Sequence, residues 1–218
     1  MIGISARIAL TLSLGILALF PSLSTAHETA KALSVKALEE CDIGRRTTER
    51  HFRIGHFEKS QTLAEQAVAL DEQSADAHYA LFCTLGEQLR IDGEKLTSVF
   101  GLRRMIKELD RTLELNPDHI DAVSAKGTML TRLPGMLGGD AQRGEQMLRQ
   151  VIQRDQRAIN ARMVLAKFEC GRGRHRDAME LATAALELAR DEHRDDLIPE
   201  AEATVSSLKA TETIRTKR

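Results

Sequence analysis

The sequence has few aromatic residues, prolines and cysteines, and each shortage narrows the class of protein. It has no Trp, one Tyr and 3% aromatic residues, whereas 42% of its 218 residues are hydrophobic. This composition favours helices packed through small side chains over a β-sandwich, and only 4 Pro interrupt them. The chain is long and apolar enough to bury one sizeable core, so we expect a single folded domain.

No long run of charges of one sign is present. The 31 basic and 32 acidic side chains are mixed along the chain and leave a net charge of −1. A polybasic arm is therefore missing, which argues against nucleic acid or an anionic membrane as the main partner. Solvated helix surfaces explain the mixture.

Catalytic and metal-binding motifs are also missing from the sequence. It has no GxSxG elbow, no phosphate-binding P-loop and no HExxH pair, and the adjacent carboxylates Glu39-Glu40 and Asp195-Asp196 would point apart on a helix. We therefore predict that the protein is not an enzyme and has no cofactor and no metal site. Two weaker alternatives are copper chelation by His27 at a newly formed N-terminus and anion binding by the basic turn 172–177.

The first 26 residues have the features of an export signal. Arg7 provides a positive charge, residues 8–20 are apolar but short for a bilayer span, and Ser24-Thr25-Ala26 offers small residues for cleavage. We expect cleavage after Ala26, a mature domain at 27–218 in the periplasm, and no stable membrane anchor. An uncleaved anchor is the alternative.

The three cysteines, Cys41, Cys83 and Cys170, are odd in number and have no CxxC spacing. If the helical register described below holds, the three cysteines lie on first helices at three different levels of the helical stack. We predict no intrachain disulfide, although Cys41 could pair with Cys83 if the first helix is shifted.

Residues 159–188 have the clearest pattern, that of two short helices joined at Gly173. Small residues recur where two helices must approach closely, at Ala161, Ala166, Ala178 and Ala185. Similar but looser patterns upstream predict an all-α chain of about four helical hairpins. The predicted hairpins cover about 29–71, 75–116, 120–155 and 159–189, and a capping helix covers about 197–210.

Breaks in the pattern mark the hairpin boundaries. Gly55 is expected to divide the first hairpin, and Asn116-Pro117-Asp118 to separate the second from the third. The third is split by the turn-rich insert 133–140, whose Asp140 can cap the following helix. The last helix is expected to cover the end of the stack. It has Pro199 in its first turn and an apolar stripe of Ala201, Val205 and Leu208.

The second helices carry equivalent pairs at 67–68, 112–113, 151–152 and 185–186, which are 45, 39 and 34 residues apart. The last spacing equals the tetratricopeptide period of about 34 residues. The excess in the first two spacings falls at Asp92-Gly93 and at the insert, where extra residues leave the stacking faces intact.

Residues 57–189 resemble tetratricopeptide repeats, as Gly127, Leu113, Pro117, Gly173, Ala178 and Ala185 illustrate. The segments ELNPDHIDAVSAKG and LPGMLGGDAQRGEQML further resemble a bacterial subgroup similar to the T-component proteins of TRAP transporters and to regulator of microtubule dynamics proteins. The chain departs from the repeat pattern because His78, Val123 and Arg162 replace the large aromatic residue of the first helix, and Gly144 replaces the usual Ala.

Stacked hairpins of this kind form an α-α superhelix, a solenoid whose first helices line a concave groove. The repeat register places the following groove candidates on the first helices: Asp76, Tyr79, Cys83, Asp121, Ser124, Thr128, Asn160, Met163 and Lys167. Their mixed chemistry suits an extended peptide or a partner helix, so we expect an exported scaffold that binds a protein partner. The resemblance implies an alternative, a small-molecule-binding accessory of a TRAP-type solute transporter. A sealed apolar pocket would favour that alternative, and an open polar groove would favour a protein partner.

Overall fold

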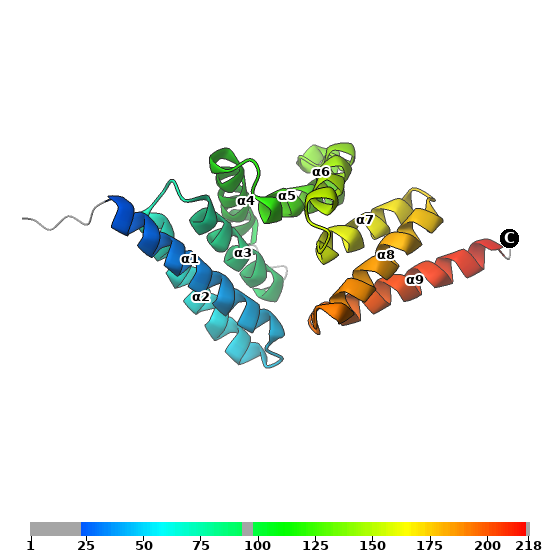
Figure 1. Ribbon diagram of the computed structural model, residues 1–218, viewed down its shortest axis with the longest axis horizontal. Coiled ribbons are helices and arrows are strands. Elements are labelled where there is room, and N and C mark those ends of the chain that lie inside the picture. The colour runs from blue at the N-terminus through cyan, green and yellow to red at the C-terminus, as the bar shows by residue number, and fades with distance from the viewer. Residues whose placement is uncertain (1–22, 93–97, 217–218) are drawn as a thin grey trace, which may run out of the picture.

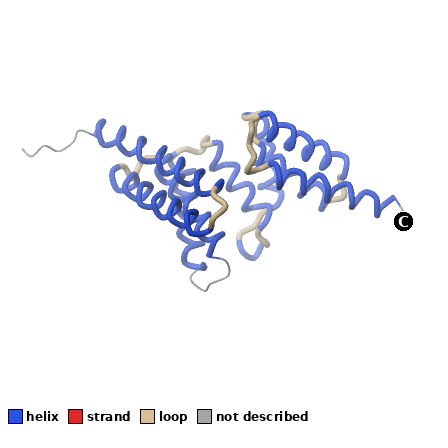
Figure 2. The backbone as a smooth tube through the Cα atoms, turned by 90° about the horizontal axis from the view of Figure 1, so that it is seen from below, coloured by secondary structure: helices blue, strands red, loops and turns tan. Residues whose placement is uncertain are grey.

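The structure is a computed structural model that describes residues 23–92 and 98–216. These residues form only helices, turns and loops, without a strand. The helices are α1 (Leu23–Arg46), α2 (Arg50–Leu70), α3 (Ala75–Asp92), α4 (Ser98–Leu115), α5 (Ile120–Arg132), the 3₁₀ turn η1 (Gly135–Leu137), α6 (Ala141–Arg154), α7 (Ile159–Gly171), α8 (His175–Asp191) and α9 (Ile198–Thr216). The prediction of an all-α fold is confirmed (Figure 2).

Successive helices pair as hairpins, α1 with α2, α3 with α4, α5 with α6, and α7 with α8, and α9 packs against α8 (Figure 1). The hairpins are placed side by side along the chain. Helices α1–α4 and α7–α9 form two arms on either side of α5. The predicted order of four hairpins and a capping helix is therefore present in the structure.

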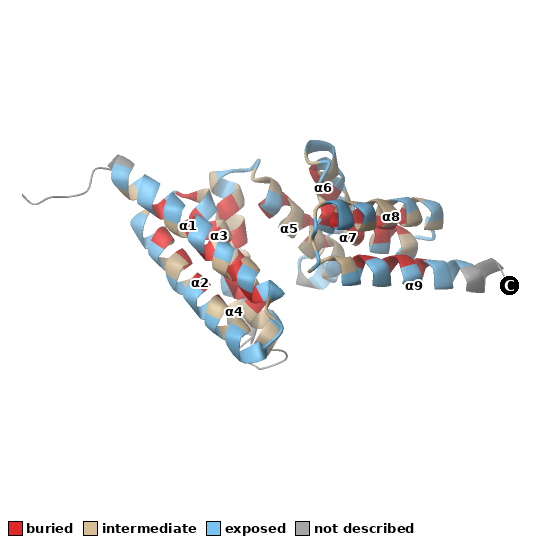
Figure 3. Ribbon diagram, turned by 60° about the horizontal axis from the view of Figure 1, so that its bottom comes forward, coloured by how far each residue is buried: buried red, intermediate tan, exposed pale blue. Residues whose placement is uncertain are grey.

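Small side chains form the seams between the helices, as their spacing predicted. Ala161, Ala166, Ala178 and Ala185 have at most 1% of their surface exposed, and Leu165 is buried with Ala161 against Val123, Leu148 and Val151 of the preceding hairpin. In Figure 3, buried residues follow the sides on which neighbouring helices face each other. Burial of this apolar surface is the main stabilising contribution in the fold.

Helices α5 and α6 approach so closely that two glycines meet at their contact. A Cβ atom on Gly144 would lie 2.7 Å from the carbonyl oxygen of Gly127, and one on Gly127 would lie 2.9 Å from Leu148. Gly144 replaces the alanine usual in the repeat pattern because this seam has no room for a methyl group.

The break in the first hairpin was predicted wrongly. The chain turns at residues 47–49, and Gly55 lies inside α2 with nothing within 4 Å of its Cβ position. An exposed helical glycine is a weak helix breaker, because it costs only about 1 kcal/mol relative to alanine. Gly44 is the glycine that the packing requires, since a Cβ there would clash with the ring of Phe57 at 2.5 Å.

The turns of the last two hairpins agree with their predicted chemistry. The Asp140 side chain accepts a hydrogen bond of 2.9 Å from the backbone N–H of Arg143 and so caps α6. Gly173 has a φ of 79°, a left-handed conformation that glycine adopts without a steric penalty. The Asp92-Gly93 break cannot be assessed in the same way, because Gly93 lies outside the described residues.

Helix α9 covers the end of the stack. Ala201, Val205 and Leu208 are buried, and they pack near Ala182, Ala185 and Ala189 of α8. The helix extends to Thr216, beyond the predicted end near residue 210. Among the described residues, no helix combines the length and apolar character needed to span a bilayer. The predicted signal sequence lies mostly outside these residues, and α1 begins at Leu23, before the predicted cleavage point.

Candidate partner-binding groove

Helices α5 and α7, the first helices of the third and fourth hairpins, present polar side chains along one surface. Asp121, Ser124 and Thr128 follow each other at helical spacings of three and four residues on α5, and Asn160 and Lys167 occupy matching positions on α7. Asp121, Asn160 and Lys167 are exposed, and Ser124 and Thr128 are partly exposed.

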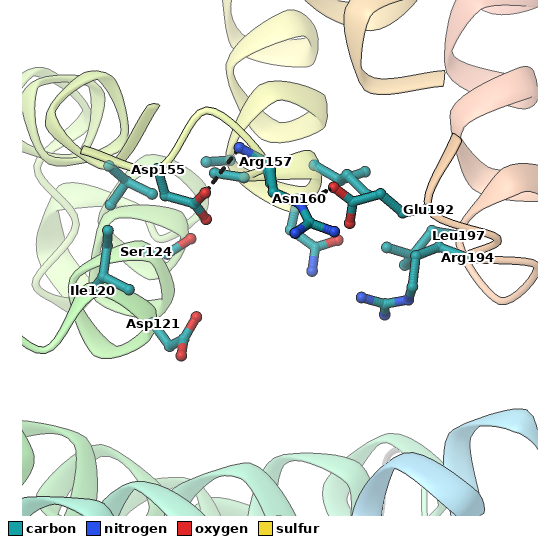
Figure 4. Close-up of a pocket in the computed structure, with 13 residues that line it drawn as sticks. Ile120, Asp121, Ser124, Asp155, Arg157, Asn160, Glu192, Arg194 and Leu197 are labelled. Atoms are coloured by element: carbon teal, nitrogen blue, oxygen red, sulfur yellow. Dashed lines mark hydrogen bonds and ion pairs between the residues drawn. The ribbon is translucent and has the colours of Figure 1, made fainter. Parts of the chain in front are cut away.

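A pocket of about 360 Å³ lies at the N-terminal ends of these two helices (Figure 4). Three of the predicted groove residues, Asp121, Ser124 and Asn160, line it together. The other lining residues come from α5, α6, α7 and the turns before α7 and after α8, and they are Ile120, Val151, Asp155, Arg157, Ala158, Ile159, Ala161, Glu192, Arg194 and Leu197. In Figure 4, the side chains of Asp121, Asn160 and Arg194 lie on the same side of the pocket.

The two arginines of this pocket are held by ion pairs. The guanidinium of Arg157 donates a hydrogen bond to Glu192, which raises the pKa of Arg157. Arg194 donates two hydrogen bonds, of 2.9 and 2.8 Å, to Asp196, and these lower the pKa of Asp196. The arginines are thus fixed by the protein itself, whereas Asp121 and Asn160 have no hydrogen bond from another described side chain.

The candidates on α3 lie next to the start of α5. The Tyr79 ring is 4.5 Å from the ring of His119 and 5.9 Å from that of Phe82, and burial raises the pKa of the Tyr79 phenol well above its usual range. Asp76 is exposed and lies 3.6 Å from His119 Nε2. The Tyr79 side chain therefore packs, partly buried, against the cluster of Cys41, Phe57 and Cys83, and its phenol stays neutral.

Met163 does not belong to the groove surface, contrary to our prediction. Only 2% of it is exposed, and it is buried with Ile159, Ala185, Ala189 and Ala201. Met163 occupies the position on α7 that matches Ser124 on α5, but on α7 this position is covered by α8 and α9. Cys83 is likewise buried, in a cluster with Cys41 and Phe57.

A second pocket, of about 390 Å³, lies between the C-terminal ends of α5 and α7. Lys167 was predicted as a groove residue, whereas the other residues that line this pocket were not predicted. The pocket is lined by Thr131, Arg132, Val164, Lys167, Phe168, Gly171 and Arg172. Continuing the stripe of Ser124 and Thr128 by one further helical turn would have identified Thr131 and Arg132.

The basic turn after α7 binds carboxylates of the protein itself. Glu169 has no exposed surface, and its carboxylate accepts hydrogen bonds from Arg149 and Arg174. Arg172 donates to Glu145 at 2.6 Å. Burial opposes ionisation of Glu169, but the hydrogen bond from Arg174 and the charges of Arg174, Arg149 and Arg172 together outweigh it and lower the pKa of Glu169. The arginines of this turn are therefore engaged in holding α6 and α7 together.

Histidines and cysteines make no metal cluster within residues 23–92 and 98–216. His27 lies with Nδ1 2.6 Å from Asp71, and His56 lies with Nδ1 2.8 Å from Glu40. All three cysteines are free thiols. Burial raises the pKa of Cys41 to about 12, so this thiol stays protonated and unreactive at neutral pH.

Searches of protein-family models and of curated proteins found no match to this chain. Among solved structures, yeast Tom70 is similar with a TM-score of 0.47 and 18% identity, over 88% of this chain and 44% of that one. MamA from Desulfovibrio magneticus RS-1 has a TM-score of 0.45 and 16% identity, over 80% of this chain and 96% of that one. YrrB, described as a TPR protein with an unusual peptide-binding site, has a TM-score of 0.35 and 17% identity, over 84% of this chain and 98% of that one.

Proposed function

We propose that this protein is a scaffold that binds a segment of a partner protein non-covalently along the surface formed by α5 and α7. The observation that carries the proposal is the pocket of about 360 Å³ in which Asp121, Ser124 and Asn160 come together. These groups offer a carboxylate, a hydroxyl and an amide, which can hydrogen-bond the main chain of an extended peptide.

The character of the pocket favours a protein segment over a small solute. Seven of its lining residues are polar or charged, namely Asp121, Ser124, Asp155, Arg157, Asn160, Glu192 and Arg194. Small-molecule sites are mostly apolar and enclose most of their ligand. Because this pocket is lined mainly by polar and charged groups, the TRAP-type accessory function is the less supported alternative.

We also propose that the protein works in the periplasm after removal of residues 1–26. The support is the arrangement of Arg7, the apolar residues 8–20 and the small residues 24–26. Expression in a bacterium with a secretory pathway, followed by N-terminal sequencing of the periplasmic fraction, tests this. A chain retained with residues 1–26 in the membrane fraction contradicts it.

Selection of peptides from a random display library on the purified protein tests the binding function. We expect selected peptides to bind the wild type and to lose about tenfold or more in affinity for Asp121→Ala and Asn160→Ala, because each change removes hydrogen bonds to the bound main chain. The matched controls, Glu187→Ala and Gln150→Ala, change an exposed acid on α8 and an exposed amide on α6. Equal losses in the controls, or no loss in the groove variants, would show that the peptides bind elsewhere.

A further inference from the structure

We propose that the pocket between the C-terminal ends of α5 and α7 binds an acidic side chain of the partner segment, with an apolar residue beside it. This inference rests on the peptide-binding function and specifies the chemistry of the ligand. The lining supplies three cations, Arg132, Lys167 and Arg172, and an apolar floor of Val164 and Phe168, but no carboxylate. The volume of about 390 Å³ is within the usual range for ligand sites.

The three cations differ in how far the protein already engages them. The Arg132 side chain is exposed and makes no hydrogen bond or ion pair with another described side chain. Its charge does act on Glu200, whose pKa is lowered first by the hydrogen bond from Lys167 and also by Arg132. Lys167 pairs with Glu200 at 2.7 Å, but about half of each side chain is exposed. Exposed ion pairs of this kind contribute little, so Lys167 can exchange Glu200 for a carboxylate of the partner.

Arg172 lies over the ring of Phe168, one of the two floor residues. The guanidinium carbon of Arg172 lies 4.5 Å from the centre of the Phe168 ring, while its Nη1 atom holds Glu145 at 2.6 Å. This arrangement keeps the guanidinium in a fixed plane over the ring. A partner's apolar side chain can pack on the floor next to an acid that faces Arg132 and Lys167.

Helix C-termini attract cations by themselves, because their carbonyl groups carry partial negative charge. Here the final carbonyls of α7 already accept backbone hydrogen bonds. Arg172 N–H donates to the carbonyls of Phe168 and Glu169, and Gly173 N–H donates to that of Cys170. At the end of α5, Leu133 N–H and Asp140 N–H donate to the carbonyls of Met129 and Leu130. Stabilisation of these helix ends therefore does not require the side chains of Arg132 and Lys167.

Both pockets are lined by residues of the same two helices, α5 and α7. Ser124 in the first pocket and Thr131 in the second are seven positions apart on α5, a rise of about 10 Å. An extended segment covers that distance in about three residues. The structure thus places the acidic residue of the partner about three residues from the one that occupies the first pocket.

Peptide selection on three proteins tests this chemistry: the wild type, the double variant Arg132→Gln with Lys167→Gln, and the control Arg103→Gln with Lys107→Gln. The control removes two exposed cations from α4 and so changes the net charge equally. We expect peptides selected on the wild type and the control to be enriched in Asp and Glu at one position, and those selected on R132Q/K167Q to lack this enrichment. An acidic peptide should bind the wild type about tenfold more tightly than its counterpart with the amide, a ratio that falls toward one in R132Q/K167Q.

Each other outcome contradicts the proposal in a distinguishable way. Selected peptides that depend on Asp121 and Asn160 but show no acidic preference would reject the acidic subsite and leave the groove function standing. An acidic preference lost equally in R103Q/K107Q would reflect net charge and would also reject the subsite. If no peptide depends on Asp121 or Asn160, both the subsite and the groove function fail.

Discussion

At the scale of single residues, glycine has opposite roles at two helical positions. Gly144 lies where α5 and α6 touch, and a Cβ there would meet the Gly127 carbonyl oxygen at 2.7 Å and the Thr131 methyl at 2.8 Å. Gly55 lies in α2 with open space around it. Both residues disrupt the helical pattern equally in the sequence, so only the packing distinguishes the glycine that is required from the one that is not.

Substitution of these two glycines by alanine should change stability in opposite directions. Gly144→Ala should lower the free energy of unfolding by about 1–3 kcal/mol, because backbone atoms must move apart. Gly55→Ala, the matched control, should raise it by about 0.5–1 kcal/mol, because alanine favours the helix and fits without contact. Urea unfolding of both variants checks the prediction, and a stabilised Gly144→Ala would contradict the close contact of α5 and α6.

The buried carboxylate of Glu169 is a second feature at this scale. Replacement by Gln should lower the free energy of unfolding at neutral pH by about 1.5–3 kcal/mol, because the hydrogen bonds to Arg149 and Arg174 lose their charge. The exposed control Glu187→Gln should change it much less. Similar values for both would mean that Glu169 is not part of the support between α6 and α7.

The stability should also depend on pH through Glu169. Because its pKa is lower in the folded chain than the ordinary value of 4.5, the stabilisation is complete above pH 4.5 and is lost as the pH falls through the folded pKa. Below pH 4.5 the wild type should lose stability more steeply than Glu169→Gln. Unfolding measured at several acidic pH values checks this, and parallel curves would refute the lowered pKa.

At the scale of elements, local sequence signals predicted most helices. The range of α5 was predicted correctly, and the caps at Asp140 and Gly173 formed as expected. The break of the first hairpin was missed because no Pro or Gly marks residues 47–49, and the burial of Met163 was missed because it depends on how α8 and α9 meet α7. The second pocket, likewise, requires two helices far apart in the sequence.

Helix α9 provides a test at this scale. Removal of residues 197–218 would expose Ala185, Ala189 and Met163, which α9 helps to bury. Because neighbouring hairpins stabilise each other mainly through direct contact, the amide hydrogens of α7 and α8 should exchange much faster while those of α1 and α2 stay protected. Removal of residues 211–218 alone should leave exchange in α7 and α8 unchanged. Uniform loss of protection over the whole chain would contradict this local role.

At the scale of the whole molecule, the hairpins form two arms on either side of α5 (Figure 1), and the first pocket lies at the N-terminal ends of α5 and α7 (Figure 4). The repeat register predicted which helices carry this surface. The first pocket itself could not be predicted, because residues of the turns at 155–158 and 192–197 complete it from outside the register.

Hydrogen exchange of the intact protein, with and without a selected peptide, tests the central claim most directly. Our account predicts slower exchange in α5, in α7 and in the turns at 155–158 and 192–197, with no change in α2 and α4. Protection confined to α2 and α4, with α5 and α7 unaffected, would contradict it.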